Sequence, residues 1–350
     1  MSAKENAVGN RWVVPIMGTI LQICLGTVYA WSFFQKLIMK DFGWSNTQVM
    51  WIFSIAICFL GISAAWGGIN LPKYGPKKLA ITGGLLYGAG WILGMLAMKM
   101  SSLPLFYLGF GVIGGCGLGL GYVTPVATSV KWFPDKKGFI TGMVVMGFGL
   151  GALVMSKVIA PLLLTITSDN LPMTFLYTGL FMLVLIPLAG SFMKNPPAGW
   201  LPAGYTPPAV NAASKAADDK MTAKDSILSG RFAILWLIFF ANISAGMMFI
   251  GLQSPMLQDI LKLRDASLDI KALAAAGATL VAITSLFNGL GRFFWGGVSD
   301  KIGRVPTFRI LLASQILVFI ALIFLKDPII FSVLVCYVLL CYGGGFGTMP

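Results

Sequence analysis

Apolar runs of about twenty residues recur along the whole chain and restrict its fold more than any other feature. Apolar residues make up 57% of the 350 positions and charged residues 11%, with a mean hydropathy of +0.85. In hydrocarbon, only helices and closed barrels satisfy every backbone polar group internally. The sequence therefore predicts an all-α polytopic membrane protein. Ten spans are expected, at about 12–35, 49–71, 79–98, 103–130, 139–165, 172–193, 231–254, 272–299, 306–325 and 329–350.

Lysine and arginine residues sort by loop and do not gather in a patch. With the N-terminus placed inside, the cytoplasmic segments carry 16 of the 25 basic residues and the opposite segments carry eight. The positive-inside rule then predicts a multi-pass protein of the cell inner (plasma) membrane with a cytoplasmic N-terminus. The net charge of +13 reports this topology, so the predicted partner is the lipid bilayer and not nucleic acid.

One arginine lies inside an apolar run. Arg292 is the sole ionised group between Lys271 and Asp300, and helical rise places it roughly 12 Å inside the membrane. Such a cation costs about 2.5–3.5 kcal/mol and usually marks a substrate path. The alternative is an arginine that reaches the helix end or pairs with a neighbour, but no carboxylate lies within the run, so an anion is the predicted partner. Asn288, one turn earlier on the same face, is predicted to orient the guanidinium or contact the substrate.

Two loop segments repeat at an offset of 228 residues. Each has a glycine, then a basic residue, then a second glycine, and such parallel repeats are found in a large class of transporters with the binding site between the halves. The first copy has Pro72 where the second has Asp300, which places in doubt a gating salt bridge through that position. The gating-loop residues expected from the repeat are Gly68, Lys73, Gly75, Asp300, Lys301, Gly303 and Arg304.

The chain divides at its only long polar stretch. Residues 195–230 open with Asn-Pro-Pro and continue through Ala, Ser, Asp and Lys, a composition typical of a cytoplasmic linker. Residues 1–194 are then an N-terminal six-helix bundle, and residues 231–350 are a C-terminal bundle with four helices.

The residues that usually build metal centres and catalytic sites are missing or misplaced. Histidine is absent, and all five cysteines fall inside apolar runs without metal-site spacing. Neither a metal site nor a histidine proton relay is expected, and no cofactor is predicted. No nucleophile–base pair is visible, so the chain is not expected to be an enzyme.

Three motifs narrow the class of transporter: GTVYAWS at 26–32, KWFPDKKG at 131–138 and NGLGRFFWGGVSD at 288–300. Together with the repeat they resemble the oxalate/formate antiporter family of the major facilitator superfamily and its monocarboxylate-transporter relatives. The resemblance implies a major facilitator fold of two six-helix bundles. It also implies that Arg292 binds the substrate carboxylate and that Tyr29, Tyr122 and Tyr342 line the site.

The resembling family has twelve helices, and its oxalate carriers have a second cation, a lysine on the eleventh. This chain ends within its tenth apolar run, so we expect two helices to be missing and the deficit to be functionally serious.

The expected function is secondary active transport of small organic anions such as oxalate and formate, by anion exchange with alternating access. In proton-coupled relatives an aspartate is typical where this chain has Asn288, and no Asp or Glu occurs deep in any run, which favours exchange. One alternative is a proton-coupled symporter of lactate or pyruvate, with protons as a further partner. An alternative of another class is a non-transporting membrane sensor or a truncated relic.

Overall fold

The computed structural model describes residues 10–202, 204–206, 223–324 and 327–348, and every regular element in these ranges is a helix. Ten helical spans are long and apolar enough to cross a membrane, which confirms the predicted fold class. The elements are α2 (Val13–Gly26), η1 (Thr27–Ala30), α3 (Trp31–Phe42), α4 (Asn46–Tyr74), α5 (Pro76–Lys99), α6 (Leu103–Phe106), η2 (Tyr107–Gly114), α7 (Gly115–Trp132), α8 (Lys137–Val154), η3 (Met155–Ile159), α9 (Ala160–Ile166), α10 (Leu171–Gly190), α12 (Ala223–Ile227), α13 (Gly230–Arg264), α14 (Ile270–Ile302), α15 (Arg304–Phe324) and α16 (Pro328–Thr348).

The seventh span is longer than the sequence suggested. We expected it to end at residue 254, before Pro255, but α13 continues to Arg264 with this proline inside the helix. Proline removes one backbone donor and usually ends a helix in water. Within a membrane it is tolerated, because neighbouring groups satisfy the freed carbonyl and no water competes for the backbone.

Three spans change helix type along their length. The first passes from α2 through the tight 3₁₀ segment η1 into α3, and the fourth and fifth contain the π-helical segments η2 and η3. Each change alters the direction in which the following side chains point. Tyr29 lies within η1, so the side chain of a predicted site residue is aimed by the irregular part of its span.

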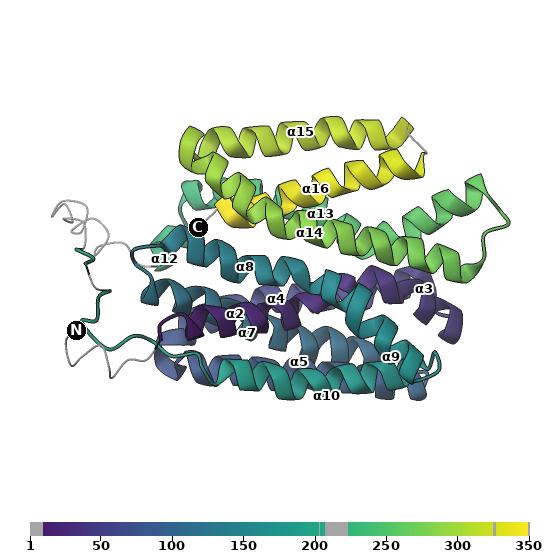
Figure 1. The fold of residues 1–350 in the computed structure, drawn as a ribbon, viewed down its shortest axis with the longest axis horizontal. Helices are drawn as coiled ribbons and strands as arrows, with labels where there is room; N and C mark the ends of the chain where they lie inside the picture. Colours follow the sequence, from purple (N-terminus) through teal and green to yellow (C-terminus); the bar gives the residue numbers. More distant parts are fainter. Residues whose placement is uncertain (1–9, 203, 207–222, 325–326, 349–350) are drawn as a thin grey trace.

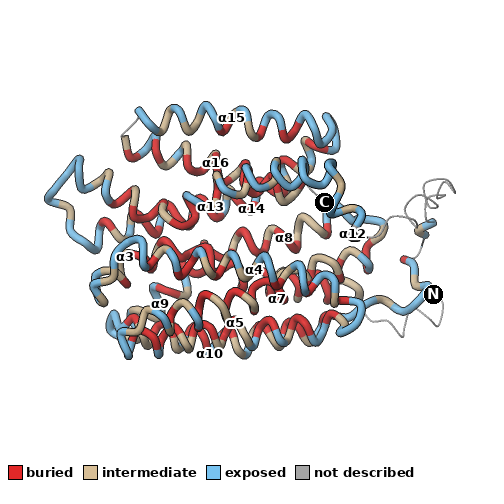
Figure 2. Tube along the Cα trace, turned by 180° about the vertical axis from the view of Figure 1, so that it is seen from behind, coloured by how far each residue is buried: buried red, intermediate tan, exposed pale blue. Residues whose placement is uncertain are grey.

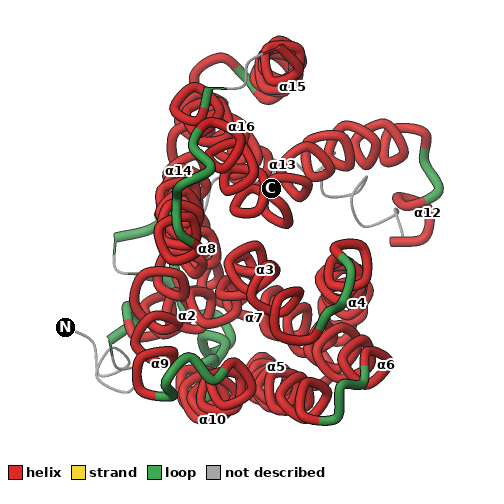
Figure 3. The backbone as a smooth tube through the Cα atoms, turned by 90° about the vertical axis from the view of Figure 1, so that its right-hand side faces the viewer, coloured by secondary structure: helices red, strands yellow, loops and turns green. Residues whose placement is uncertain are grey.

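The helices form two groups that lie side by side (Figures 1 and 3). In the first group α5 packs against α7 and α10, α4 packs against α7, and α2 packs against α8. In the second, α14 packs against α16 and α13. The groups meet where α8 contacts α14 and where α3 contacts α13. The predicted domain boundaries stay predictions, since much of the 195–230 segment, residues 203 and 207–222, lies outside the described residues.

Buried residues concentrate between helices, while the outer faces of the spans are exposed (Figure 2). In the most apolar 18-residue stretch of α15, 17% of the residues are buried, and in that of α13 the share is 22%. Their exposed side chains include Trp236, Phe240 and Ile316. Because these surfaces are apolar, they suit contact with lipid and not with water.

The turns and connections between the spans lie at two opposite ends of the molecule. One end, the Gly303 end, carries Asp135 and the tight turns at Gly75 and Gly303. The opposite end, the Asp265 end, carries the connection between α13 and α14, the end of α15 and the start of α16 (Figure 1).

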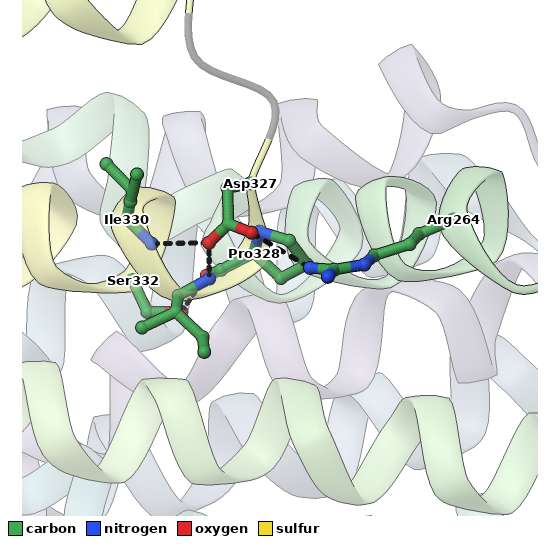
Figure 4. Close-up of polar contacts among 6 residues, drawn as sticks. Arg264, Asp327, Pro328, Ile330 and Ser332 are labelled. Carbon is green, nitrogen blue, oxygen red and sulfur yellow. Dashed lines mark hydrogen bonds and ion pairs between the residues drawn. The ribbon is translucent and has the colours of Figure 1, made fainter.

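Asp327 joins two spans at the Asp265 end. Its carboxylate accepts the N–H groups of Ile329 and Ile330 at 2.9 and 3.1 Å, and Arg264 at the end of α13 donates to it at 2.8 Å (Figure 4). The helix-start N–H groups, followed by the guanidinium, hold the pKa of Asp327 below its ordinary value. The aspartate therefore starts α16 and ties it to α13.

Candidate functional site

Arg292 lies on α14 of the second helix group, with 2% of its surface exposed. Glycines bring α16 against this part of α14. A methyl group added to Gly347 would lie 2.9 Å from Arg292 Cα, and one added to Gly291 would lie 3.0 Å from Leu340 Cα. Such small residues let membrane helices approach closely. The backbone contact fixes the position of the arginine.

The guanidinium has few partners of its own. Its Nη2 lies 3.5 Å from Asn288 Oδ1, at the outer limit of a hydrogen bond, and its Cζ lies 4.9 Å from the centre of the Phe346 ring. Nε and Nη1 are buried and have no hydrogen-bond acceptor in the described part of the protein. No Asp or Glu is found among the buried side chains of the described residues. Arg292 therefore presents a buried positive charge with unused donors.

Two of the three predicted tyrosines lie near the arginine, since the Tyr342 ring packs on the Phe346 ring at 5.2 Å and Phe346 lies over the guanidinium. The hydroxyls of Tyr29 in η1 and Tyr342 in α16 lie 2.5 Å apart and form a hydrogen bond between the two helix groups. Tyr342 is fully buried and Tyr29 is 5% exposed. Tyr122 is one ring further away, because it packs on Phe148 at 5.2 Å and Phe148 packs on Tyr29 at 4.9 Å. The structure thus brings Arg292, Asn288, Tyr29 and Tyr342 into one cluster, with Tyr122 at its edge.

A cavity of about 800 Å³ leads from Arg292 toward the Gly303 end, between α7 and α8 on one side and α14 and α16 on the other. Its deep part is lined by the Arg292 side chain and by apolar residues such as Val145 and Phe346. Lys137, Asp300 and Arg304 also line it. The cavity therefore combines the buried Arg292 cation and apolar side chains with the charged residues Lys137, Asp300 and Arg304, an arrangement that fits a small anion.

Comparison with known proteins places the chain. The sequence profile of the Major Facilitator Superfamily matches residues 16–350. The chain belongs to this superfamily. It is 27% identical to the oxalate:formate antiporter of Oxalobacter formigenes, over 98% of this chain and 76% of that protein. Monocarboxylate transporter 12 of Rattus norvegicus is 32% identical over 43% of this chain and 31% of that protein.

Solved structures agree on the fold of this superfamily member. A bacterial homologue of the human lysosomal transporter Spinster aligns with a TM-score of 0.64 at 16% identity, covering 97% of this chain and 74% of that one. The predicted superfamily and fold are confirmed. Superfamily and relatives together make this multi-pass membrane protein a transporter and not an enzyme.

The predicted gating-loop residues lie at the Gly303 end of this transporter. Gly75 ends α4 with a φ of +77° and ψ of 158°, and Gly303 ends α14 with +89° and 160°. Positive φ is a conformation that glycine adopts without steric cost, so the two repeat copies share one turn geometry.

The other members of the loop set differ in their surroundings. Pro72 lies inside α4, and the Lys73 ammonium lies 5.3 Å from the Tyr74 ring. Gly68 and Lys301 are exposed. Of the set, only Asp300 and Arg304 line the cavity.

Several residues of the cluster carried no signal in the sequence. Phe346 lies over Arg292, Phe148 connects two tyrosines, and Ser285 bonds to the backbone of α8. Gln253 is 2% exposed and its side-chain oxygen has no described partner. Phenylalanine and serine are ordinary in membrane helices, whereas a glutamine inside an apolar run is costly in lipid, and this residue type could have marked Gln253.

Within the described residues no three His, Cys, Asp or Glu side chains come together to hold a metal ion. The five cysteines are free thiols, and Cys24, Cys336 and Cys341 are buried. Trp31 of the GTVYAWS motif packs in the first helix group against Phe53 and Phe110. It belongs to the same hydrophobic core as Tyr29 and Tyr342.

Proposed function

We propose that this superfamily member is a secondary carrier that exchanges small organic anions across the plasma membrane, with its N-terminus on the cytoplasmic side. The observation that carries the proposal is Arg292, a buried cation with unused N–H donors on Nε and Nη1 at the closed end of an 800 Å³ cavity. A guanidinium presents a planar fork of donors that matches a carboxylate in a bidentate pair. The similarity to an oxalate:formate antiporter and a monocarboxylate transporter supports the same class of substrate.

Each residue of the cluster has a role in this proposal. Arg292 pairs with the carboxylate, and Asn288, on the same face one turn away, restrains the guanidinium. The Tyr29 and Tyr342 hydroxyls are donors and acceptors at once, so either can turn from its partner to the anion. Val145 and Phe346 contact the apolar part of the substrate and exclude water.

Alternating access follows from the two helix groups. The Tyr29–Tyr342 hydrogen bond joins the groups on the side of Arg292 that faces the Asp265 end, and the cavity opens toward the Gly303 end. Without an anion, the rocking movement would carry a bare buried charge through an apolar barrier, which is costly. A bound carboxylate neutralises Arg292, so the loaded carrier crosses more readily than the empty one, and this difference couples inward to outward flux.

Exchange is favoured over proton symport because the buried described side chains include no Asp or Glu that would carry a proton across the membrane. A counterflow assay with the 350-residue protein in liposomes tests the proposal. Labelled oxalate, formate and lactate are offered outside, with unlabelled anion inside. Uptake that needs internal anion is the expected result. Uptake driven by a pH gradient alone would favour the proton-coupled carrier, and saturable binding without flux would favour a sensor.

A further inference from the structure

Ser285 of α14 forms hydrogen bonds with the backbone of α8 in the other helix group. Its hydroxyl donates to Gly149 O at 2.5 Å and accepts from Leu153 N–H at 2.9 Å. In an α-helix the N–H of residue i pairs with the carbonyl of residue i−4, and Gly149 and Leu153 are such a pair. The serine hydroxyl therefore joins both ends of one turn of a helix to which it does not belong.

The same turn of α8 stands next to an irregular segment. The π-helical element η3 begins at Met155, two residues after Leu153. Side chains that insert into the backbone hydrogen bonds of a helix, and π-segments, are recognised causes of local bends. The backbone of α8 is thus adapted to Ser285 at this level of the membrane.

Two glycines make the contact close. A methyl group added to Gly149 would lie 2.9 Å from Gly289 Cα. Gly289 follows Ser285 by one helical turn, and a methyl group added to it would lie 3.2 Å from Leu150 Cδ2 and 3.3 Å from Met146 Cγ of α8. The two helices therefore meet through backbone, the serine hydroxyl and side chains packed on glycine, and they run side by side in Figures 1 and 3.

The contact lies at the boundary between a closed and an open part of the interface. Toward the Asp265 end, the groups are held by Lys157, which donates to Thr279 Oγ1 at 2.7 Å. Toward the Gly303 end, the cavity lies between the groups, with Thr141 of α8 and Gly296 of α14 both on its wall. Ser285 therefore lies at the level where the distance between the two helix groups would change least as they rock against each other.

We propose that Ser285 is a positioning residue and that its hydrogen bonds to Gly149 and Leu153 form the pivot of the transport cycle. This inference rests on the proposed exchange function. Because Ser285 and Arg292 lie on the same helix, two turns apart, the pivot also fixes the depth at which Arg292 meets the substrate as α14 tilts. The side chain bonds to backbone atoms, so the contact tolerates rotation of α14 without the loss of a side-chain partner.

The test compares Ser285→Ala with Ser285→Thr, which keeps a hydroxyl, and with Ser314→Ala. Ser314 of α15 is a matched control because its hydroxyl bonds to Ile310 O and Leu311 O of its own helix. Formate affinity, the rate of formate exchange and the hydrogen–deuterium exchange of backbone amides in α8 and η3 are measured on the full chain.

Ser285→Ala loses two hydrogen bonds to the backbone of α8 and is expected to lower the rate of formate exchange by about 5- to 30-fold, the factors for losing one or both bonds, with the formate affinity within about twofold of the wild type. Its α8 amides exchange faster, while Ser285→Thr and Ser314→Ala behave as wild type. The pivot is overturned if Ser285→Ala leaves the rate of formate exchange unchanged. It is also overturned if Ser285→Ala and Ser314→Ala lower that rate equally. A wild-type protein without exchange refutes the proposed function alone. In that case, faster α8 amide exchange in Ser285→Ala only would uphold the anchoring contact, and unchanged amide exchange would refute it.

Discussion

Replacing Arg292 by methionine distinguishes a residue kept for ligand binding from one that stabilises the fold. An arginine deep in the membrane costs about 2.5–3.5 kcal/mol. In this protein the Phe346 ring at 4.9 Å recovers about 0.5–2 kcal/mol. The contact with Asn288 Oδ1 at 3.5 Å adds less than about 1 kcal/mol. The remaining cost is about 1 kcal/mol, so Arg292→Met is expected to raise the free energy of unfolding by that amount.

The same change removes the anion partner. A carboxylate bound to Nε and Nη1 makes two charge-assisted hydrogen bonds worth about 1.5–3 kcal/mol each. Losing both weakens binding by about 3–6 kcal/mol, or a factor of about 10²–10⁴. The free energy of unfolding therefore rises while the affinity for the carboxylate falls steeply. An arginine kept for the stability of the fold would not show this combination.

Thermal unfolding in detergent, followed with a thiol-reactive dye, measures the stability because Cys24 and Cys341 are buried in the folded state, while the exposed Cys58 gives the same background in each variant. Isothermal titration with formate, oxalate and lactate measures the affinity. Arg309→Met is the control, since Arg309 is exposed on α15. A lower unfolding temperature for Arg292→Met than for the control, or retention of anion affinity by Arg292→Met, would refute the reasoning.

Two further predictions follow from contacts outside the anion site. Gly26→Ala is expected to prevent folding, because the added methyl group would collide with the carbonyl oxygen of Phe148, whereas Gly61→Ala meets no atom within 4 Å and should leave yield and melting temperature unchanged; fluorescence-detected size-exclusion chromatography compares the two. At the Gly303 end, the hydrogen bond from Arg11 holds the pKa of Asp135 below its ordinary value. Its stabilisation, about 1 kcal/mol or less for such a pair, is present at neutral pH and lost as the pH falls through the folded-state pKa. The melting temperature of Asp135→Asn is therefore expected to lie below the wild type at pH 7, to begin to converge with it below about pH 4 and to meet it below the folded-state pKa of Asp135; a gap that persists at still lower pH would contradict this.

Much of the fold follows from local properties of the sequence. Hydropathy identified ten spans in the described residues, because the number of residues in an apolar run sets the length of the helix, and this length must match the thickness of the membrane. The repeat matched Gly75 with Gly303, and the structure gives both a positive φ, which is a local demand on the backbone. The expected end of the seventh span at residue 254 was wrong. Proline ends a helix less reliably in a membrane than in water, and α13 continues through Pro255 to Arg264.

The residues of the anion site also divide into those that the sequence identified and those whose contacts needed the tertiary structure. The sequence alone singled out Arg292, because a charge inside an apolar run is visible without any knowledge of its neighbours. It also placed Asn288 on the same face, since helical spacing is local. Only the tertiary structure brought Tyr29 to Tyr342, 313 residues apart, laid Phe346 over the guanidinium, and joined Ser285 to the backbone of α8. Those contacts depend on how closely glycines let the helices approach and on where 3₁₀ and π-segments turn a side chain, and neither is set by hydropathy.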